Sequence, residues 1–361
     1  MHKNFYRFLV LVTIIVLSAT SGCLSAKQSA IPDSASTFTN SNHEIIIPID
    51  SPEIPARGFF MGIMPIPRQG QSFADAYKEI SAWAEFVPLW GRPTRFFDLV
   101  KDLSGEWGKT FVEQYIRGNG MFPLVHMSFI GSGLTLIVPP GIPGATLTNT
   151  EWRKAYKQAA IDVVRVSRPL YFSIGNEVNR WYEKYGAREN DPDGFQNFVS
   201  LYNEIYDAVK KISPQTKVFC TFAREIVSEN READMTVLNM FDPNRMDILV
   251  LTSYPYAVRG IKRPLDIPND YYARITDYMP GKPLGLSEVG WSSLEAFGGD
   301  QAQADFIDEI TGRLTTGRGI KLEFIGWPWS SALDDDSIGL IKRSGEERLA
   351  LETWRKVYSN H

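Results

Sequence analysis

Cysteine and histidine are scarce in this chain. Its 361 residues include two cysteines, Cys23 and Cys220, and four histidines. His126 is the only histidine well inside the chain, because the other three are His2, His43 and His361. This shortage disfavours a zinc site built from cysteine and histidine. It also disfavours a Cys–His dyad and leaves only His126 for a serine triad.

The chain also lacks a strong excess of charge of either sign. The formal net charge is -4, so no basic face for a nucleic-acid partner is expected. No repeat of the solenoid type is present. The hydrophobic content of 43% is ordinary for a globular protein and sufficient for one large core or two smaller ones. Aromatic residues make up 12% of the chain, including nine tryptophans, which suits either core packing or stacking on sugars.

The only long apolar run lies near the N-terminus. Residues 8–18 are almost entirely apolar and follow the basic Lys3 and Arg7, a pattern typical of a signal peptide and shorter than a membrane span. Residues 20–23, Thr-Ser-Gly-Cys, resemble a lipoprotein lipobox, with Thr20 in place of the usual leucine. We expect a signal peptide over 1–23, a lipid on Cys23 and a flexible tether over 24–43. Ordinary secretory cleavage and an uncleaved anchor remain alternatives.

The remainder, residues 44–361, alternates between apolar strand-like runs and helix-like runs. The strand-like runs are short and show little alternation, as expected for strands buried on both faces. Eight are predicted: 58–64, 84–89, 122–129, 170–175, 218–223, 248–253, 283–288 and 323–327. Helices are predicted over 73–80, 106–116, 148–164, 193–212, 225–239, 270–278, 302–314 and 346–357. Cys220 lies in the fifth strand, where a buried thiol is expected to act as a small apolar filler.

This alternation predicts an α/β fold, a closed (β/α)8 TIM barrel. The rival is an open doubly wound sheet, which favours a glycine-rich phosphate turn after its first strand. Residues 61–67, Met-Gly-Ile-Met-Pro-Ile-Pro, supply no such turn. The N-terminus of the 148–164 helix is predicted to carry a capping box formed by Thr148 and Glu151.

Two glutamates follow predicted strands at one rim of such a barrel. Glu177 comes directly after the fourth strand and Glu288 ends the seventh, 111 residues later (288 − 177). Active sites of these barrels lie at the C-terminal ends of the strands. A pair of carboxyl groups there is what glycoside hydrolysis requires: one donates a proton to the leaving oxygen, and the other is ionised and faces the anomeric carbon.

These residues resemble those of a known group of enzymes. Asn176 and Glu177 after strand four, with Glu288 at strand seven, resemble the hallmark of clan A glycoside hydrolases. Residues 287–291, Ser-Glu-Val-Gly-Trp, resemble the nucleophile segment of endo-β-1,4-galactanases and plant-type endo-β-1,3-glucanases. The resemblance covers the chain from about residue 44 to the end. It implies a retaining β-glycosidase, with Glu177 as acid/base, Glu288 as nucleophile and Asn176 on the sugar 2-hydroxyl.

Further site residues are suggested by their positions at strand ends. The resemblance suggests that Tyr254 contacts the nucleophile and that Arg92, after strand two, pairs with a carboxylate. His126 ends strand three and is expected to line the cleft. Tyr254 and His126 could equally be packing residues. Five aromatic residues lie at or beyond strand ends, of which two or three are expected to be sugar platforms: Trp181, Tyr182, Trp291, Trp327 and Trp329.

The expected mechanism fixes where the protons lie. We expect carboxyl groups ~5–5.5 Å apart, with Glu288 ionised and Glu177 protonated. No cofactor or metal is expected, although the acidic run 334–336 could bind calcium through its oxygens instead of forming a solvated turn. The expected partners are a β-linked carbohydrate and, through the lipid anchor, a membrane, with the chain a monomer. A transglycosylase with the same residues and an inactive carbohydrate-binding barrel are the alternatives.

Overall fold

The computed structural model describes residues 45–89, 94–332 and 337–359. Its main sheet contains nine parallel strands in the order β7-β6-β3-β2-β1-β13-β12-β11-β8. The two strands at the ends of this order, β7 (Lys217–Phe219) and β8 (Thr221–Ala223), are separated only by Cys220 and form one interrupted strand. Because β7 pairs with β6 and β8 pairs with β11, the sheet closes on itself. The predicted (β/α)8 barrel is confirmed.

The barrel strands follow one another around the sheet in chain order. Strands one to four are β1 (Phe60–Ile63), β2 (Phe86–Pro88), β3 (Phe122–His126) and β6 (Tyr171–Ser173). Strand five is β7 with β8, and strands six to eight are β11 (Leu249–Ser253), β12 (Leu284–Val289) and β13 (Leu322–Trp327). Each lies within a predicted run or overlaps it closely. Two small hairpins are added, β4 (Ile130–Gly131) with β5 (Thr135–Leu136) and β9 (Glu225–Ile226) with β10 (Arg231–Glu232).

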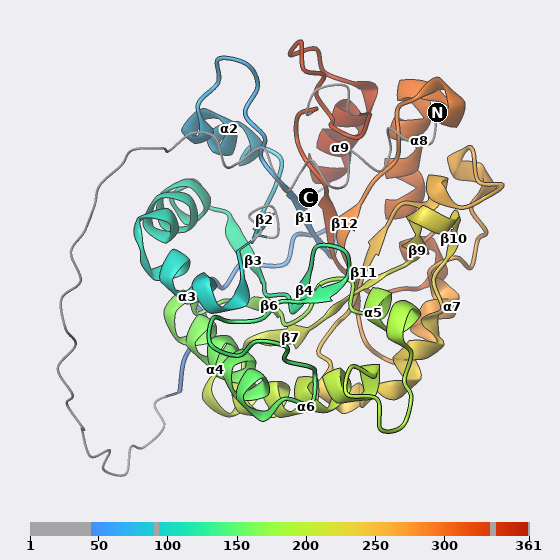
Figure 1. The fold of residues 1–361 in the computed structure, drawn as a ribbon. Helices are drawn as coiled ribbons and strands as arrows, with labels where there is room; N and C mark the ends of the chain where they lie inside the picture. Colours follow the sequence, from blue (N-terminus) through green and yellow to red (C-terminus); the bar gives the residue numbers. More distant parts are fainter. Residues whose placement is uncertain (1–44, 90–93, 333–336, 360–361) are drawn as a thin grey trace.

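Helices surround these strands in a ring (Figure 1). They are α2 (Phe73–Ile80), α3 (Phe96–Ser104), α4 (Thr150–Ser167), α5 (Asn179–Tyr185), α6 (Phe195–Ile212), α7 (Ala273–Thr276), α8 (Gly299–Thr311) and α9 (Leu349–Ser359), with a π-helix at Gly108–Ile116. The apolar stripe of α6 is buried as the sequence predicts, from Phe195 to Ile212. No described helix is long and apolar enough to cross a membrane.

Four local predictions are wrong. The segment 225–239 is not an α-helix: β9 and β10 turn back on each other near Asn230, which has a left-handed φ of 54°, and the only helical turns are short 3-10 segments at Val227–Glu229 and Met235–Met240. Of 270–278 only the four residues of α7 are α-helical, and α3 was not predicted. The start of α4 has no Thr148–Glu151 box. Instead, Asn149 accepts a hydrogen bond from the Trp152 N–H at 2.9 Å.

Aromatic rings fill the barrel interior. The rings of Phe86, Phe122, Tyr171 and Phe324 contact one another with centroids 5.3–5.8 Å apart. Gly285 makes room for this cluster, because a Cβ there would lie 2.6 Å from the Phe324 ring. The interior is therefore a packed core, and chemistry is confined to the strand ends.

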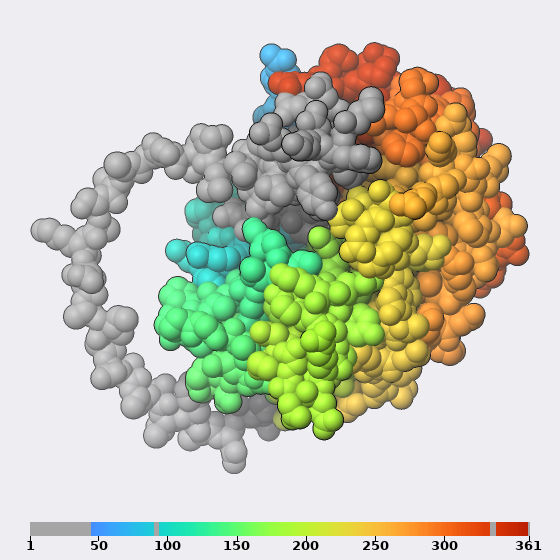
Figure 2. Space-filling model, turned by 45° about the vertical axis from the view of Figure 1, so that its right-hand side comes forward, coloured from blue at the N-terminus to red at the C-terminus, as the bar shows by residue number. Residues whose placement is uncertain are grey.

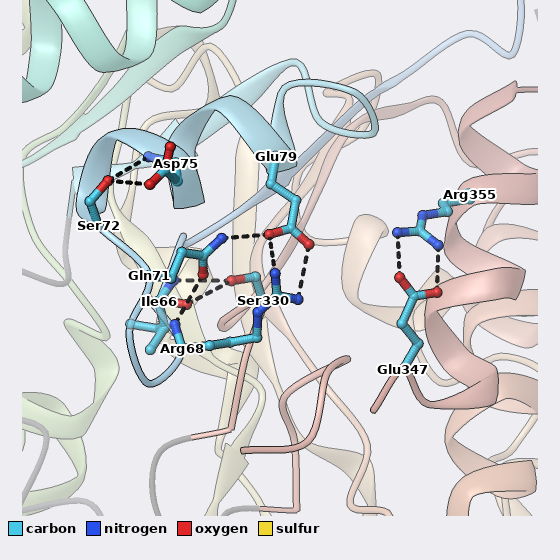
Figure 3. Close-up of polar contacts among 9 residues, drawn as sticks. All are labelled: Ile66, Arg68, Gln71, Ser72, Asp75, Glu79, Ser330, Glu347 and Arg355. Atoms are coloured by element: carbon cyan, nitrogen blue, oxygen red, sulfur yellow. Dashed lines mark hydrogen bonds and ion pairs between the residues drawn. The ribbon is translucent and has the colours of Figure 1, made fainter. Parts of the chain in front are cut away.

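The loops that follow the first and last strands are hydrogen-bonded to each other at the rim of the barrel. Ser330, three residues after β13, accepts the N–H of Ile66 at 3.0 Å through its hydroxyl, and its own N–H donates to Met64 at 2.8 Å. Beyond Ile66, Arg68 and Gln71 both bind Glu79 at the end of α2 (Figure 3). The loop after strand one is therefore held against α2 and forms a fixed part of the rim.

Cys220 is fully buried within strand five, as predicted for a packing residue, and burial raises the pKa of its thiol well above the usual value. The predicted signal peptide, Cys23 and the tether lie outside the described residues, as do Arg92 and the acidic run 334–336.

Candidate active site

Glu177 lies in a strained turn after strand four. Its φ is 47°, in the left-handed region that few side chains adopt. Strand five holds this turn: the Glu177 N–H donates to the Thr221 hydroxyl at 2.8 Å, and the Val178 N–H donates to the Thr221 carbonyl at 3.0 Å. The same Thr221 hydroxyl donates to Asn176 Oδ1 at 2.7 Å. Thr221 thus holds the backbone of Glu177 and Val178 and the side chain of Asn176.

Glu288 is aimed by an irregularity in strand seven. Leu251 pairs with Leu286, but the next residue of strand six, Thr252, pairs with Glu288, so Ser287 is an extra residue. Gly285 faces the interior ring of Phe324, and regular alternation would bring Ser287 to that side next. The bulge instead turns Glu288 inward, which is a common use of bulges next to active sites.

Strand six joins the two glutamates. The Thr252 hydroxyl donates to Glu177 Oε1 at 2.8 Å, and the Tyr254 hydroxyl binds Glu288 Oε1. Thr252 and Tyr254 are two residues apart on extended chain, a spacing of ~7 Å on one face. The structure therefore brings Glu177, Glu288 and Tyr254 together at the C-terminal rim, as expected from the sequence.

The electrostatic surroundings of Glu288 differ from the expected ones. Burial, and then the nearby charge of Glu177, raise the pKa of Glu288 to about 8, while the hydrogen bond from Tyr254 opposes this rise. Glu177 instead forms an ion pair with Arg180, Oε2 to Nη1 at 2.8 Å. These surroundings favour the protonated form of Glu288 in the free protein, where the sequence analysis expected it to be ionised. The prediction missed this because the burial of Glu288, the largest cause, cannot be read from the local sequence.

A second buried carboxyl supports Tyr254. Glu225 is 5% exposed; its Oε2 accepts the Tyr254 N–H at 2.7 Å, and its Oε1 accepts the hydroxyls of Ser253 and Tyr271, both at 2.8 Å. Burial raises the pKa of Glu225 to about 7. Its neighbour Arg224 stacks on Tyr271 with a cation-to-centroid distance of 4.0 Å. Sequence reasoning missed Glu225 because it placed this residue in a helix. The adjacent Arg-Glu pair directly after a buried strand was the available signal.

The loops after strands four and five form one wall beside the site. Glu183 of α5 binds Arg231 of β10 at 2.8 Å and accepts the Asp234 N–H at 2.8 Å. Figure 2 shows these segments side by side in yellow-green and yellow. Asn179, at the start of α5, is fully buried and exchanges two hydrogen bonds with Ala223 of β8, at 2.8 and 2.7 Å. Asn179 is a second supporting residue that the sequence analysis did not single out.

His126 ends strand three with its ring unpaired. It is 7% exposed, and among the described residues neither ring nitrogen has a hydrogen-bond partner. Burial lowers its pKa to about 3, so the ring is neutral at ordinary pH. A neutral imidazole offers one donor and one acceptor, and leaving both unpaired in a buried site is costly.

Two tryptophans expected at the sugar site are instead core residues. Trp291 and Trp327 are both 0% exposed, and their indole N–H groups donate to the carbonyls of Phe297 and Ile338. Trp327 packs on Phe306 of α8 and Trp354 of α9, so its position in β13 places it on the outer face of the barrel. Neither can stack on a sugar. Trp181 is equally buried at 1%, whereas Trp329 retains 8% exposure and Tyr182 is partly exposed.

Within the described residues no group of three or more His, Cys, Asp or Glu side chains could hold a metal ion. The groups present at the rim are carboxyls, hydroxyls, an amide, a guanidinium and an imidazole. Such groups move protons and bind hydroxylated ligands.

Comparison with known proteins supports the architecture. No protein-family profile and no curated sequence matches the chain. The solved structures that match include GH5_18 from Streptomyces cattleya in complex with GlcNAc, at 13% identity over 84% of this chain and 80% of that one, with a TM-score of 0.58. A family 39 glycoside hydrolase from Bacteroides cellulosilyticus WH2 matches at 17% identity over 86% and 65%, TM-score 0.59. A β-glucuronidase from an uncultured Clostridium matches at 12% over 84% and 50%, TM-score 0.55.

All three share the (β/α)8 barrel fold with this chain. At these identities the likeness concerns the barrel. The chain spans about half of the β-glucuronidase, so the shared part is the barrel alone.

Proposed function

We propose that this protein is a retaining glycoside hydrolase that cleaves a β-linked polysaccharide or oligosaccharide by double displacement. The observation that carries the proposal is the coupled pair: Glu177 and Glu288 approach from strands four and seven, and the charge of Glu177 contributes to the raised pKa of Glu288. Two carboxyl groups with separated proton affinities are the requirement for acid/base and nucleophilic roles on one sugar.

Each rim residue has a part in this mechanism. Glu288 attacks the anomeric carbon, and Tyr254 stabilises its ionised form through the hydrogen bond that already lowers its pKa. Glu177 protonates the leaving oxygen and then activates water. Asn176 and the unpaired ring of His126 bind hydroxyl groups of the sugar next to the scissile bond.

Product analysis tests this proposal. The purified barrel is incubated with a panel of β-linked polysaccharides, and new reducing ends are measured together with the anomeric form of the first product by NMR. Release of a β-anomer that later mutarotates supports retention. Transfer products without net hydrolysis support the transglycosylase alternative. Binding without new reducing ends, across the panel, contradicts the hydrolase and leaves the inactive binding barrel.

For location, we propose a lipid-anchored monomer held at the cell surface through Cys23 and the tether over 24–43. A dual-chain anchor is stable where a single acyl chain is marginal. Cys23→Ser is expected to release the protein from membranes or to leave an uncleaved precursor, visible by fractionation and gel migration. A variant that fractionates and migrates as wild type would contradict the anchor.

A further inference from the structure

Arg180 lies at the mouth of the site on the side of Glu177. It belongs to the first turn of α5, three residues after Glu177, and its Nη1 donates to Glu177 Oε2 at 2.8 Å. The Arg180 side chain is 36% exposed and that of Glu177 is 23% exposed, so the pair faces solvent at the rim. Within the described part of the chain, the Arg180 side chain has no polar partner other than Glu177.

This ion pair opposes the role of Glu177 as a general acid. A general acid must hold a proton, and a protonated carboxyl is no longer the anionic partner of a guanidinium. Arginine cannot release the pair by losing its own proton. The charge pairing of Glu177 with Arg180 must therefore be relieved before Glu177 can protonate the leaving group.

The substrate is the group that can break it. A neutral sugar hydroxyl that displaced Glu177 would leave the guanidinium without a counter-charge. A carboxylate or sulfate ester would replace the Glu177 carboxylate on Arg180 with equal charge, and a guanidinium binds either anion through paired N–H groups. Because the acid/base stands on the leaving-group side of the bond, the anion belongs to the sugar on that side.

We propose that the substrate is an acidic β-linked glycan whose leaving-group sugar carries a carboxylate or sulfate that takes Arg180 from Glu177. This inference rests on the proposed hydrolase function. When the anion binds Arg180, the proton that Glu288 holds in the free protein passes by exchange with solvent to Glu177. The pair keeps one proton throughout: Glu177 becomes the acid and Glu288 the ionised nucleophile. A neutral substrate does not displace Glu177 from Arg180, so the proton stays on Glu288.

Matched substrates test the proposal. The probes are mannuronan, glucuronoxylan and chondroitin sulfate, each compared with the same polymer after reduction of its carboxyl groups to primary alcohols. Chondroitin sulfate is also used after desulfation alone, which separates sulfate from carboxylate as the recognised anion, and after both treatments, which gives its neutral form. Wild type, Arg180→Met and Arg180→Lys are compared by kcat/KM. Arg165→Met is the control, since Arg165 pairs with Asp162 at the same i,i+3 spacing and at 3.0 Å on α4, away from the site.

We expect wild type and Arg165→Met to prefer one acidic polymer over its neutral form by ~10-fold or more, the scale of one charge-assisted hydrogen bond. Arg180→Met should lose that preference and act on the neutral form at least as well as wild type, because Glu177 is released. Arg180→Lys should keep part of the preference. Equal cleavage of acidic and neutral forms by wild type overturns the inference alone. So does an equal loss on both forms in Arg180→Met. Cleavage of no polymer by wild type overturns the hydrolase proposal and the inference with it.

Discussion

The ends of strands four and seven each present one glutamate, but the two are held in different ways. Glu177 sits on a strained, left-handed turn, partly exposed, with an arginine and a threonine hydroxyl on its oxygens. Glu288 sits on a bulged strand and is held by a tyrosine, with a pKa raised to about 8. Two identical side chains thus differ in their electrostatic surroundings. Burial, and then the charge of Glu177, raise the pKa of Glu288, whereas the carboxylate of Glu177 is paired with Arg180.

The largest expected loss of activity comes from removing one glutamate at a time. Glu288→Ala cannot form a glycosyl-enzyme and should be nearly inactive on every substrate. Glu177→Ala should lose ~10²–10⁴-fold on natural substrates, the range of general acid–base assistance. It should still form the intermediate from an activated aryl glycoside, because that leaving group needs no proton.

Azide distinguishes the two variants by product. Rescue of Glu177→Ala should give a β-azide of retained configuration, and rescue of Glu288→Ala an inverted α-azide, both readable by NMR. Exchanged products would show that the free-protein charges reflect the true roles, with Glu288 as the acid. If neither variant loses more than about tenfold, the site lies elsewhere.

Removing the Tyr254 hydroxyl that binds Glu288 should raise the pKa of Glu288 further. In Tyr254→Phe the hydrogen bond that lowers the pKa of Glu288 is lost. The pKa therefore rises further, and since Glu288 attacks only when ionised, the acid limb of the kcat/KM profile should move to higher pH. The loss below that limb should be ~10- to 100-fold, as for one hydrogen bond to a charged group. Tyr206→Phe is the control, because the hydroxyl of Tyr206, on α6, also donates to a carboxylate, that of Asp247, at 2.9 Å. The pH profile of this variant should match that of wild type. An unmoved limb in Tyr254→Phe would remove Tyr254 from the mechanism.

The barrel was predictable from the sequence because few folds other than a closed barrel are compatible with eight short apolar strands that alternate with helices. The site was predictable only in part. Glu177 and Glu288 stand at strand ends in the sequence itself, but the direction of a side chain just beyond a strand depends on bulges and pairing. Trp327 follows regular alternation and faces the helices, whereas Glu288 is turned inward by the extra Ser287. The segment after strand five was expected to be a helix. Instead, Glu225 in that segment accepts hydrogen bonds from residues 28 to 46 positions away in the sequence, and such long-range contacts cannot be read from local periodicity.

The smallest expected effect comes from the residue that holds the strained turn. Thr221→Val keeps the shape of the side chain but leaves the Glu177 N–H without its acceptor and Asn176 without its donor. A buried donor without a partner costs ~1–3 kcal/mol, so the midpoint of thermal or denaturant unfolding should fall. The control is Thr216→Val at the start of strand five: Thr216 is also fully buried, and its hydroxyl donates to the Pro169 carbonyl at 2.8 Å. Both variants should lose comparable stability, whereas only Thr221→Val should lose kcat, by roughly tenfold, which corresponds to ~1.4 kcal/mol. An equal kcat in the two variants would mean that the left-handed turn holds Glu177 without help from strand five, and that the strain at Glu177 is supported from within the 174–178 loop.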